Sequence, residues 1–375
     1  MKVLHYITGI SPTIGGIEKF VLNYYTKKDE EIEIEILTRY CDKTTLMYQM
    51  FEEKGITIHT LNIHHLGMSN MLVFHHRLQE FFSKHTGEYD ILHTHGIIDP
   101  FVVTLAKRNG VERVFTHVHS YIISGRKLSN IVKKISAYRN SIQADLCIAC
   151  SMDIGKIIYP KCCYKKLIEM VNGINTKEFE YSPEIREDCR AQLHLDNSFV
   201  LCNVSRMEPI KNHYFLLDIF KHLLEKKDKS VLMLIGDGTL KADLEEYTNS
   251  IGVSSNVLFL GERENVSDLL QASDAFVMPS KSEGLGISAI EAQASGLMTF
   301  VSKDVVPNSV DCTGLVSFIS IKKTADEWAE IILRKTSNTT RRSQYKKICN
   351  TEYDNAYLAK RLDNLYKGMI DENNN

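Results

Sequence analysis

The chain has 375 residues, of which 43% are hydrophobic and 25% charged, and its formal net charge is −2. A chain of this length exceeds the size at which a single hydrophobic core keeps growing, so we expect two domains in a globular protein. A net charge this small excludes a general attraction to nucleic acid. Any basic surface would therefore have to be local.

We expect neither a secretory signal nor a membrane span. The chain enters a strand-like stretch at residue 3, and no run approaches the roughly 20 apolar residues that a span requires. The nine cysteines are an odd number and are scattered, which favours a reducing, cytoplasmic compartment. Cys147, Cys150 and the pair Cys162-Cys163 could form a zinc site, but the apolar run around the first two favours buried thiols.

Short apolar runs alternate with amphipathic segments along the whole chain, which is typical of parallel strands joined by crossover helices. In the first half, strands are predicted at 3–7, 32–37, 57–61, 91–93, 114–117, 146–150 and 167–171. In the second half, they are predicted at 199–204, 231–235, 257–260, 275–278 and 298–301. The sequence therefore predicts an α/β protein with two doubly wound parallel sheets.

Turn residues and charges interrupt this periodicity between Asn172 and Pro183. We place the first domain at 1–176 and the second at 177–352. Residues 353–375 are predicted to form a C-terminal helix that packs back on the first domain.

Open parallel sheets bind ligands at the carboxyl ends of their strands, so the informative residues are those that follow the strands. Gly15 and Gly16 follow the first strand and open the next helix, where paired glycines let the backbone approach a phosphate. A plain turn explains the same glycines equally well. Gly236-Asp237-Gly238 follows another strand, but Lys241 stands where a dinucleotide fingerprint has glycine, so we predict mainly a tight turn there.

Arg206 and Lys211 bracket the turn after the strand at 199–204. Arginine offers a planar fork and lysine a point charge, and together they can neutralise the charge that develops on a leaving diphosphate. Two solvated surface charges are the alternative, but this would not explain why both bracket a strand-to-helix turn.

The strongest signal lies at 279–292, where Glu283 stands in a glycine-bracketed loop and Glu291 stands in the following helix. At about 1.5 Å per helical residue plus a few extended residues, the two carboxylates can lie on the order of 10 Å apart. That separation suits a ligand with hydroxyls at both ends and phosphates between them. An ordinary helix would not bury Glu291 among apolar neighbours.

Together these motifs resemble the group 1 family of retaining glycosyltransferases with the GT-B fold, especially those that build capsular polysaccharides and exopolysaccharides. The resemblance spans nearly the whole chain. It also rests on Tyr-Asp-Ile-Leu-His-Thr-His at 89–95, His-Val-His-Ser at 117–120, Asn-Gly-Ile at 172–174, and the Glu-x7-Glu spacing of Glu283 and Glu291.

The resemblance implies two Rossmann-like domains that face a central cleft. It implies retaining transfer of a hexose or N-acetylhexosamine from a nucleotide-diphospho-sugar, by analogy a UDP-sugar, to a saccharide or polyprenyl-diphosphate-linked acceptor in surface polysaccharide assembly. The leaving phosphate itself helps to take the acceptor proton. No cofactor and no metal ion are expected, and the sequence has no Asp-x-Asp motif in a metal-binding context, which agrees with helix ends and cations replacing a metal.

The resemblance also assigns residues. The catalytic residues that it implies are His119, His117 and Glu283. The donor-binding residues that it implies are Gly15, Gly16, Arg206, Lys211, Gly284, Leu285, Gly286 and Glu291. The family's histidine follows an N-terminal strand, so we prefer His119 to His117, while two structural histidines remain the alternative.

Residues 125–139 contain five cations and no acidic residue, interleaved with apolar side chains. This pattern predicts a basic amphipathic helix. We expect it to meet the anionic inner face of the plasma membrane and to present a lipid-linked acceptor. The alternative is a solvated helix whose apolar stripe belongs to the core.

Two other functions fit the same fold. A nucleotide-sugar epimerase would act on the donor without an acceptor, and a non-catalytic partner of another glycosyltransferase would have lost the charges of the cleft. A nicotinamide-dependent oxidoreductase is disfavoured, because the segment 8–12 lacks the Gly-x-Gly-x-x-Gly spacing.

Overall fold

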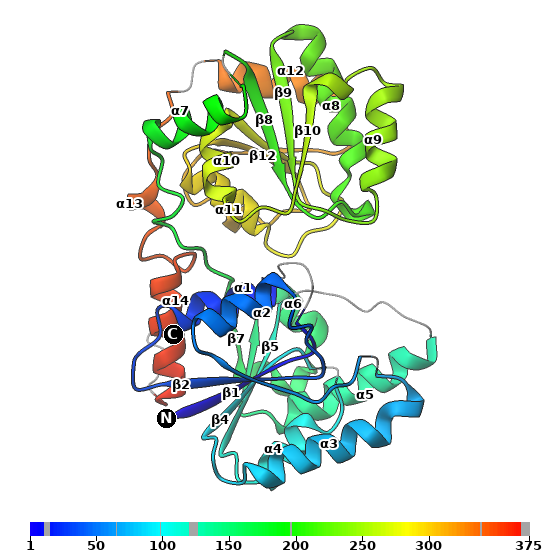
Figure 1. Cartoon of the computed structure of the whole chain (residues 1–375), viewed down its shortest axis with the longest axis vertical. Coiled ribbons are helices and arrows are strands. Elements are labelled where there is room, and N and C mark those ends of the chain that lie inside the picture. The colour runs from blue at the N-terminus through cyan, green and yellow to red at the C-terminus, as the bar shows by residue number, and fades with distance from the viewer. Residues whose placement is uncertain are drawn as a thin grey trace. The chain divides into compact units, whose positions relative to one another are not determined.

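The computed structural model divides the chain into two compact units (Figure 1). The first consists of Met1–Gly173 and Asn355–Asn375, and the second consists of Ile174–Asp354. These borders lie within a few residues of the predicted ones at 176/177 and 352/353. The structure describes residues 1–10, 16–64, 66–97, 99–119, 127–195, 197–337 and 340–368, without the side chains of residues 68 and 127–133.

The described part of the first unit contains a seven-stranded sheet in which every pairing is parallel. Its strands are β1 (Lys2–Ile7), β2 (Glu33–Thr38), β3 (Thr57–Thr60), β4 (Ile91–His95), β5 (Arg113–Val118), β6 (Leu146–Ala149) and β7 (Leu167–Glu169). Its helices are α1 (Gly16–Tyr25), α2 (Leu46–Glu53), α3 (Met71–Lys84), α4 (Val102–Arg108), α5 (Lys127–Gln143), α6 (Met152–Ile158) and α14 (Asn355–Tyr366). Helices α3, α4 and α5 lie side by side, while α14, from the end of the chain, packs against α1 (Figure 1).

The strand order in this sheet is β3-β2-β1-β4-β5-β6-β7, so the order reverses between β1 and β4. The carboxyl ends of strands at such a reversal form the usual ligand site of a doubly wound sheet. Strand β1 is central and almost wholly apolar, as a parallel strand covered on both faces must be. The exceptions are Lys2, the first residue of the strand, and His5, which is fully buried.

The described part of the second unit contains a six-stranded parallel sheet in the order β10-β9-β8-β11-β12-β13, with its reversal between β8 and β11. Its strands are β8 (Phe199–Val204), β9 (Ser230–Ile235), β10 (Val257–Gly261), β11 (Ala275–Met278), β12 (Met298–Ser302) and β13 (Val316–Ile319). Its helices are α7 (Pro183–Gln192), α8 (His213–Lys226), α9 (Lys241–Ser250), α10 (Val266–Ala272), α11 (Ile287–Ala294), α12 (Ala325–Thr336) and α13 (Tyr345–Ile348).

Strand β13 was not predicted. It is a four-residue strand at the edge of the sheet, and only Ser317 and Ile319 of it are buried. A short edge strand needs little apolar surface, so its sequence lacks the continuous apolar run of the central strands.

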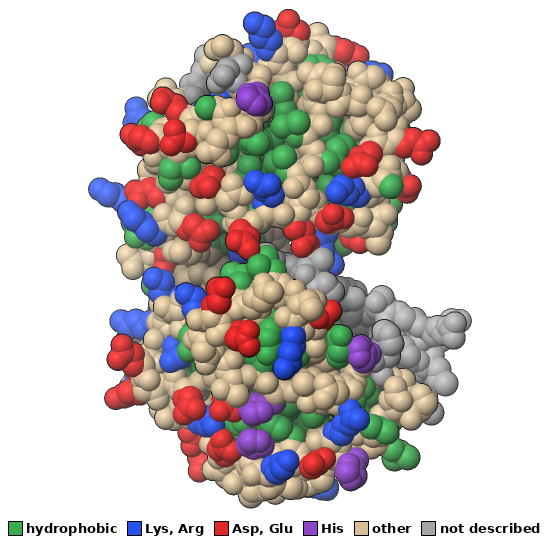
Figure 2. Space-filling view, viewed as in Figure 1, with side chains coloured by type: hydrophobic (Ala, Val, Ile, Leu, Met, Phe, Trp, Pro, Cys, Tyr) green, Lys and Arg blue, Asp and Glu red, His purple; other side chains and the backbone are tan. Residues whose placement is uncertain are grey.

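Each unit has its own core. In the second, α8 and α12 pack together over the sheet, and the fully buried Trp328 donates its indole N–H to the Ser320 carbonyl at 3.1 Å. Acidic and basic side chains are interspersed over the visible face of the units (Figure 2), in keeping with the small net charge. The predicted fold class, two doubly wound α/β domains, is confirmed.

Candidate active site

Five histidines gather in the first unit on β1, β4 and β5 and just beyond β5. They are His5, His93, His95, His117 and His119. His5 lies beside His93 in the sheet, and His95 lies beside His117. Because alternate residues of a strand face the same side, two His-x-His pairs on neighbouring strands place their imidazoles together.

Hydrogen bonds join three of these rings in series and connect them to an amide. The Nδ1 atom of His5 lies 2.8 Å from Nε2 of His95, and Nδ1 of His95 lies 2.8 Å from Nε2 of His119. Nδ1 of His119 lies 3.0 Å from Oδ1 of Asn172. His119 therefore has both ring nitrogens engaged, and Asn172 stands at one end of the series.

The other end of the series reaches the C-terminal helix α14. The hydroxyl of Tyr366 lies 3.3 Å from Nε2 of His5 and 2.5 Å from Nδ1 of His93. Beside it, the hydroxyl of Tyr24 on α1 donates to the Asp363 carboxylate at 2.6 Å. Helix α14 thus contributes Tyr366 and Asp363 to the buried polar groups beside the first sheet.

Helix α1 covers the histidines next to Asn172. Phe20 packs edge-on against the rings of His117 and His119, with centroid distances of 5.0 and 5.2 Å. A Cβ atom on Gly16 would lie 3.9 Å from the Asn172 amide nitrogen, so the start of α1 adjoins the end of the series. The predicted Gly15 lies outside the described residues.

Burial keeps these histidines neutral. Desolvation lowers the pKa of His5 to about 3 and that of His119 to about 4, and it holds the pKa values of His93, His95 and His117 well below the usual range. His117 lies within β5 and is fully buried, whereas His119 follows the strand and is partly exposed. Of the two predicted histidines, only His119 is accessible to solvent.

Two triads of these histidines bring three ring nitrogens within 4.8 Å of one another: His5, His93 and His95, and His95, His117 and His119. Two imidazole nitrogens on a tetrahedral zinc ion would stand about 3.4 Å apart. The observed separations of 2.8 Å fit an N–H···N hydrogen bond instead. His5, His95 and His119 are therefore best described as a hydrogen-bonded series.

In the second unit, Lys211 and Glu283 form an ion pair at the reversal between β8 and β11. The Lys211 ammonium lies 2.8 and 2.9 Å from the two carboxylate oxygens, and the side chains are 18% and 6% exposed. The Ser280 hydroxyl also donates to Glu283 at 2.6 Å. Two residues predicted to contact different parts of a ligand are thus in direct contact.

Asn212 joins the same two loops. It adopts a left-handed backbone conformation (φ 62°) at the start of α8, and its side-chain amide donates to the Pro279 carbonyl at 3.0 Å. The amide N–H of Lys281 donates to the Ile210 carbonyl at 2.8 Å. The loop after β8 and the loop after β11 therefore hold each other in place.

The glycine-rich turn after β9 supports the loop that carries Arg206. A Cβ atom on Gly236 would meet the Ser205 carbonyl oxygen at 2.2 Å, and one on Gly238 would meet the Met207 backbone at 2.6–2.8 Å. The Met207 N–H also donates to the Asp237 carbonyl at 2.9 Å. These contacts require glycine. Arg206 itself is exposed, and no hydrogen bond or ion pair of its guanidinium appears among the described residues.

The loop 284–286 leads into α11, and its last residue, Gly286, has φ +80° and caps the helix without a side-chain hydrogen bond. Glycine has no side chain that could accept from the first N–H groups of α11, and of these the Ala289 N–H donates to the Gly286 carbonyl at 2.9 Å. Glu291, in the middle of α11, is only 4% exposed, as its apolar neighbours led us to expect. All the predicted donor-binding residues of this unit lie after β8 or β11.

The residues that sequence reasoning missed are mostly partners of those it found. No role is predicted from the sequence for His5, His95, Tyr366, Asn212 or Ser280, and Asn172 belongs to a motif without a role of its own. The doubled His-x-His pattern on consecutive strands was the one available signal. Tyr366 gave none, because it is 361 residues from its partner His5.

Residues 14–178 match the family described as Glycosyltransferase Family 4, and residues 185–350 match Glycosyl transferases group 1. Over 387 aligned residues, the chain is 29% identical to the Bacillus subtilis (strain 168) protein EpsF, which is named as a glycosyltransferase. That alignment covers 100% of this chain and 98% of EpsF.

A second relative is the Escherichia coli UDP-Gal:alpha-D-GlcNAc-diphosphoundecaprenol alpha-1,3-galactosyltransferase, which is 28% identical over 76% of each chain. Among solved structures, Anabaena HepE in complex with UDP and glucose has a TM-score of 0.77 at 19% identity, covering 98% of this chain and 100% of HepE. WaaG, a glycosyltransferase involved in lipopolysaccharide biosynthesis, has a TM-score of 0.73 at 15% identity, with coverage of 98% and 100%. The chain therefore belongs to the group 1 glycosyltransferases of family 4, with the GT-B fold, and is a glycosyltransferase.

Proposed function

We propose that the enzyme transfers a hexose or N-acetylhexosamine from a UDP-sugar, with retention of configuration, to a saccharide or lipid-linked acceptor in surface polysaccharide assembly. The observation that carries the proposal is the contact between Lys211 and Glu283 beside the open start of α11. A cation, a carboxylate and free N–H groups are what a diphosphate joined to a sugar needs. The UDP complexes of HepE and the name of the Escherichia coli relative support the choice of UDP and of a lipid-linked acceptor.

In this proposal, each donor-binding residue contacts a different part of the nucleotide-sugar. Arg206 and Lys211 hold the diphosphate, and the N–H groups of Gly284, Leu285 and Gly286 face the sugar. Glu291 accepts from the ribose hydroxyls. Glu283, which neutralises Lys211 in the ligand-free protein, turns to the hydroxyls of the sugar when the diphosphate replaces it. The proposal includes no metal ion and no cofactor.

In the first unit, Gly16 contributes a backbone N–H, and His119 contacts the reacting sugar. His119 is a poor candidate for the base that takes the acceptor proton, because its pKa is lowered to about 4 and both ring nitrogens are engaged. The leaving phosphate fills that role in the mechanism proposed here. His117 is buried behind it and contributes packing.

A nucleotide-sugar panel tests the donor site. UDP-sugars should raise the thermal unfolding midpoint of the wild type, because a ligand that binds only the folded state stabilises it. Arg206→Met should abolish that rise, whereas Arg334→Met, on the exposed face of α12, should preserve it. A rise that survives in Arg206→Met would contradict the assignment. Nucleotide release in the absence of any acceptor would favour the epimerase.

We also propose that α5 meets an anionic membrane surface, with the enzyme at the cytoplasmic face of the plasma membrane. In its described part, the small polar residues Ser136, Asn140 and Ser141 are buried. The residues Ile135, Tyr138 and Ile142 are 55%, 53% and 44% exposed. The apolar stripe of this part is therefore not core, which argues against the alternative. The predicted side chains at 125–133 lie outside the described residues.

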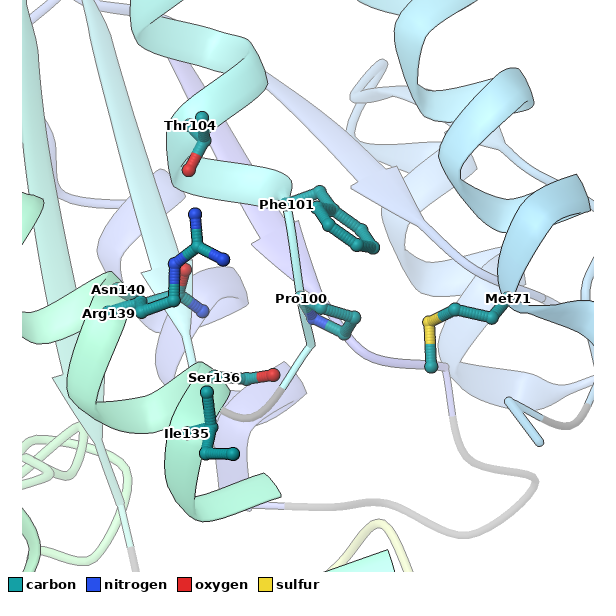
Figure 3. Close-up of a pocket in the computed structure, with 8 residues that line it drawn as sticks. All are labelled: Met71, Pro100, Phe101, Thr104, Ile135, Ser136, Arg139 and Asn140. Atoms are coloured by element: carbon teal, nitrogen blue, oxygen red, sulfur yellow. The ribbon is translucent and has the colours of Figure 1, made fainter. Parts of the chain in front are cut away.

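An apolar cavity of about 270 Å³ lies beside this face of α5. Figure 3 shows its lining from α3, the start of α4 and α5: Met71, Pro100, Phe101, Thr104, Ile135, Ser136, Arg139 and Asn140. Leu72, next to Met71, is 84% exposed. An apolar hollow beside a cation suits the first isoprene units of a polyprenyl diphosphate. Within the described residues, no helix has both the length and the hydropathy to cross a membrane.

Sedimentation with liposomes tests this surface. The wild type should sediment with vesicles that contain anionic lipid, and the double variant Lys134→Glu/Arg139→Glu should lose most of that binding, because each cation near such a surface contributes about 1 kcal/mol. The matched control is Lys84→Glu/Arg108→Glu, which makes the same change in charge at the ends of α3 and α4. Equal sedimentation of the wild type and the α5 variant would refute the proposal.

A further inference from the structure

The hydrogen bonds among the histidines form one unbranched path from His5 to Asn172, and this path has a direction. His5 and His95 are 0% and 1% exposed, so water does not supply alternative partners for their nitrogens. Their pKa values lie far below neutrality because of burial, so each ring is neutral. A neutral imidazole has one N–H donor and one lone-pair acceptor.

Because each ring has only one hydrogen to give, one fixed end determines every bond in the path. The end at Asn172 is a carbonyl oxygen, Oδ1, which can only accept. His119 must therefore donate through Nδ1 and accept through Nε2. It follows that His95 donates to His119 through its own Nδ1.

The same step repeats along β1. The Nε2 atom of His95 is left as an acceptor, so His5 donates to it through Nδ1. Nε2 of His5 then accepts from the hydroxyl of Tyr366, at 3.3 Å. Nδ1 of His93 correspondingly donates to the oxygen of that hydroxyl. Each of these groups then has a consistent role as donor or acceptor.

We propose that Asn172 is a positioning residue for His119. Its side-chain carbonyl fixes His5, His95 and His119 as one directional series of Nδ1–H donors, and so makes His119 present an N–H rather than a lone pair toward Asn172, whose amide lies beside Gly16. Tyr366 supplies the first hydrogen of the series from the C-terminal helix. His119 is then set to donate a hydrogen bond to a hydroxyl oxygen of the bound sugar.

The location of Asn172 suggests how the direction of the hydrogen bonds serves ligand binding. Asn172 lies beside the start of α1, and His119 follows β5, so both stand where ligands bind doubly wound sheets. A sugar hydroxyl that binds there can replace Asn172 as the acceptor of the hydrogen bond from the His119 Nδ1–H. This use rests on the proposed function of His119, whereas the direction of the series does not.

The direction is tested by nuclear magnetic resonance of the intact 375-residue chain labelled with ¹⁵N in histidine. Long-range ¹H–¹⁵N correlations at pH 8 show which nitrogen of each ring carries hydrogen, and the variants His5→Gln, His95→Gln and His119→Gln assign the signals. We expect all three rings in the Nδ1–H form. His119 in the Nε2–H form in the wild type would overturn the proposal.

Two substitutions of Asn172 separate positioning from packing. Asn172→Asp keeps an acceptor and should preserve the Nδ1–H form of His119, whereas Asn172→Leu removes it and should give a mixture of forms or the Nε2–H form. Tyr24→Phe is the control, because it removes a buried hydroxyl next to Tyr366 that bonds to Asp363 and to none of the histidines. An unchanged tautomer in Asn172→Leu would overturn the proposal. If Asn172→Leu does not fold, the wild type and Asn172→Asp still decide it.

Turnover separates this inference from the proposed function. Asn172→Leu should lower kcat at least tenfold and leave the KM for the donor within about twofold, while Asn172→Asp should retain most of the activity. If the tautomers respond as expected but transfer does not, the direction stands and the role of His119 in transfer is wrong. If His119→Gln abolishes transfer while Asn172→Leu retains both tautomer and turnover, the proposed function stands and the positioning role fails.

Discussion

At the scale of single residues, the contact between Lys211 and Glu283 has two consequences. The ammonium and the carboxylate are both largely removed from water, so neither can lose its partner without leaving an uncompensated charge. In the ligand-free protein, Glu283 also neutralises Lys211, whose ammonium lies 2.8 and 2.9 Å from the two carboxylate oxygens. The two charges thus offset each other, and breaking the pair lowers the stability of the second unit because it leaves one buried charge without a partner.

We expect Lys211→Met and Glu283→Gln each to destabilise the second unit by about 3 kcal/mol, near the lower end for a broken buried pair. The double variant should recover most of that loss, because it leaves no unpaired charge, yet it should still not transfer sugar. Guanidinium unfolding followed by the fluorescence of Trp328, the only tryptophan, measures the stability of this unit. Additive losses in the double variant would show that the pair is not coupled.

At the scale of elements, the turns after β8 and β9 act as one structure. Gly238 has an ordinary backbone conformation, but the Met207 backbone leaves no room for a Cβ atom beside it. The turn at residues 236–238 thus does more than lead into α9. It also supports the loop that carries Arg206. Gly252, after α9, offers a contrast, since it has φ +77° and nothing within 4 Å of its missing Cβ.

We therefore expect Gly238→Ala to push the Arg206 loop aside, lowering the affinity for UDP at least tenfold and the stability by about 1–3 kcal/mol. Gly252→Ala should lose about 1 kcal/mol from its left-handed backbone and keep its affinity. Titration calorimetry with UDP measures the affinity, and Trp328 fluorescence measures the stability. Equal affinities in the two variants would mean that the loop adjusts without cost to the site.

At the scale of the whole molecule, the two units differ in how they respond to acid. The first unit buries five neutral histidines whose pKa values lie below that of the unfolded chain. In the second, His213 is the only histidine among the described residues whose pKa is clearly lowered, to about 4. Below pH 6.5 these histidines bind protons in the unfolded chain but stay neutral in the folded units. The free energy of unfolding therefore falls as the pH falls.

Each such histidine adds about 1.4 kcal/mol of lost stability per pH unit between pH 6.5 and its folded pKa, which is about 4 for His119. We expect the first unit to lose stability several times more steeply than the second between pH 6.5 and 5. Hydrogen exchange of peptides from β1, β4 and β5, corrected for intrinsic rates, reports the first unit, and Trp328 fluorescence reports the second. Parallel losses in both units would contradict this account.

Local patterns in the sequence determined the alternation of strands and helices, the two domains, and the place of Arg206, Lys211, Glu283 and Glu291 after strands. These features depend on periodicity and turn chemistry within short windows, which a single sequence displays. The site assignments made from them remain predictions for the experiments above. The edge strand β13 was not predicted, because a four-residue edge strand is too short to show a periodic pattern.

Only the tertiary structure decided which side chains meet. Lys211 and Glu283 are 72 residues apart, His5 and His95 are 90 apart, and His5 and Tyr366 are 361 apart. Their contacts depend on strand order, on register and on the return of α14 to the first sheet, none of which a local pattern encodes. The series of histidine donors exists because parallel strands from distant parts of the chain align their carboxyl ends, where a one-residue shift would turn each imidazole to the other face.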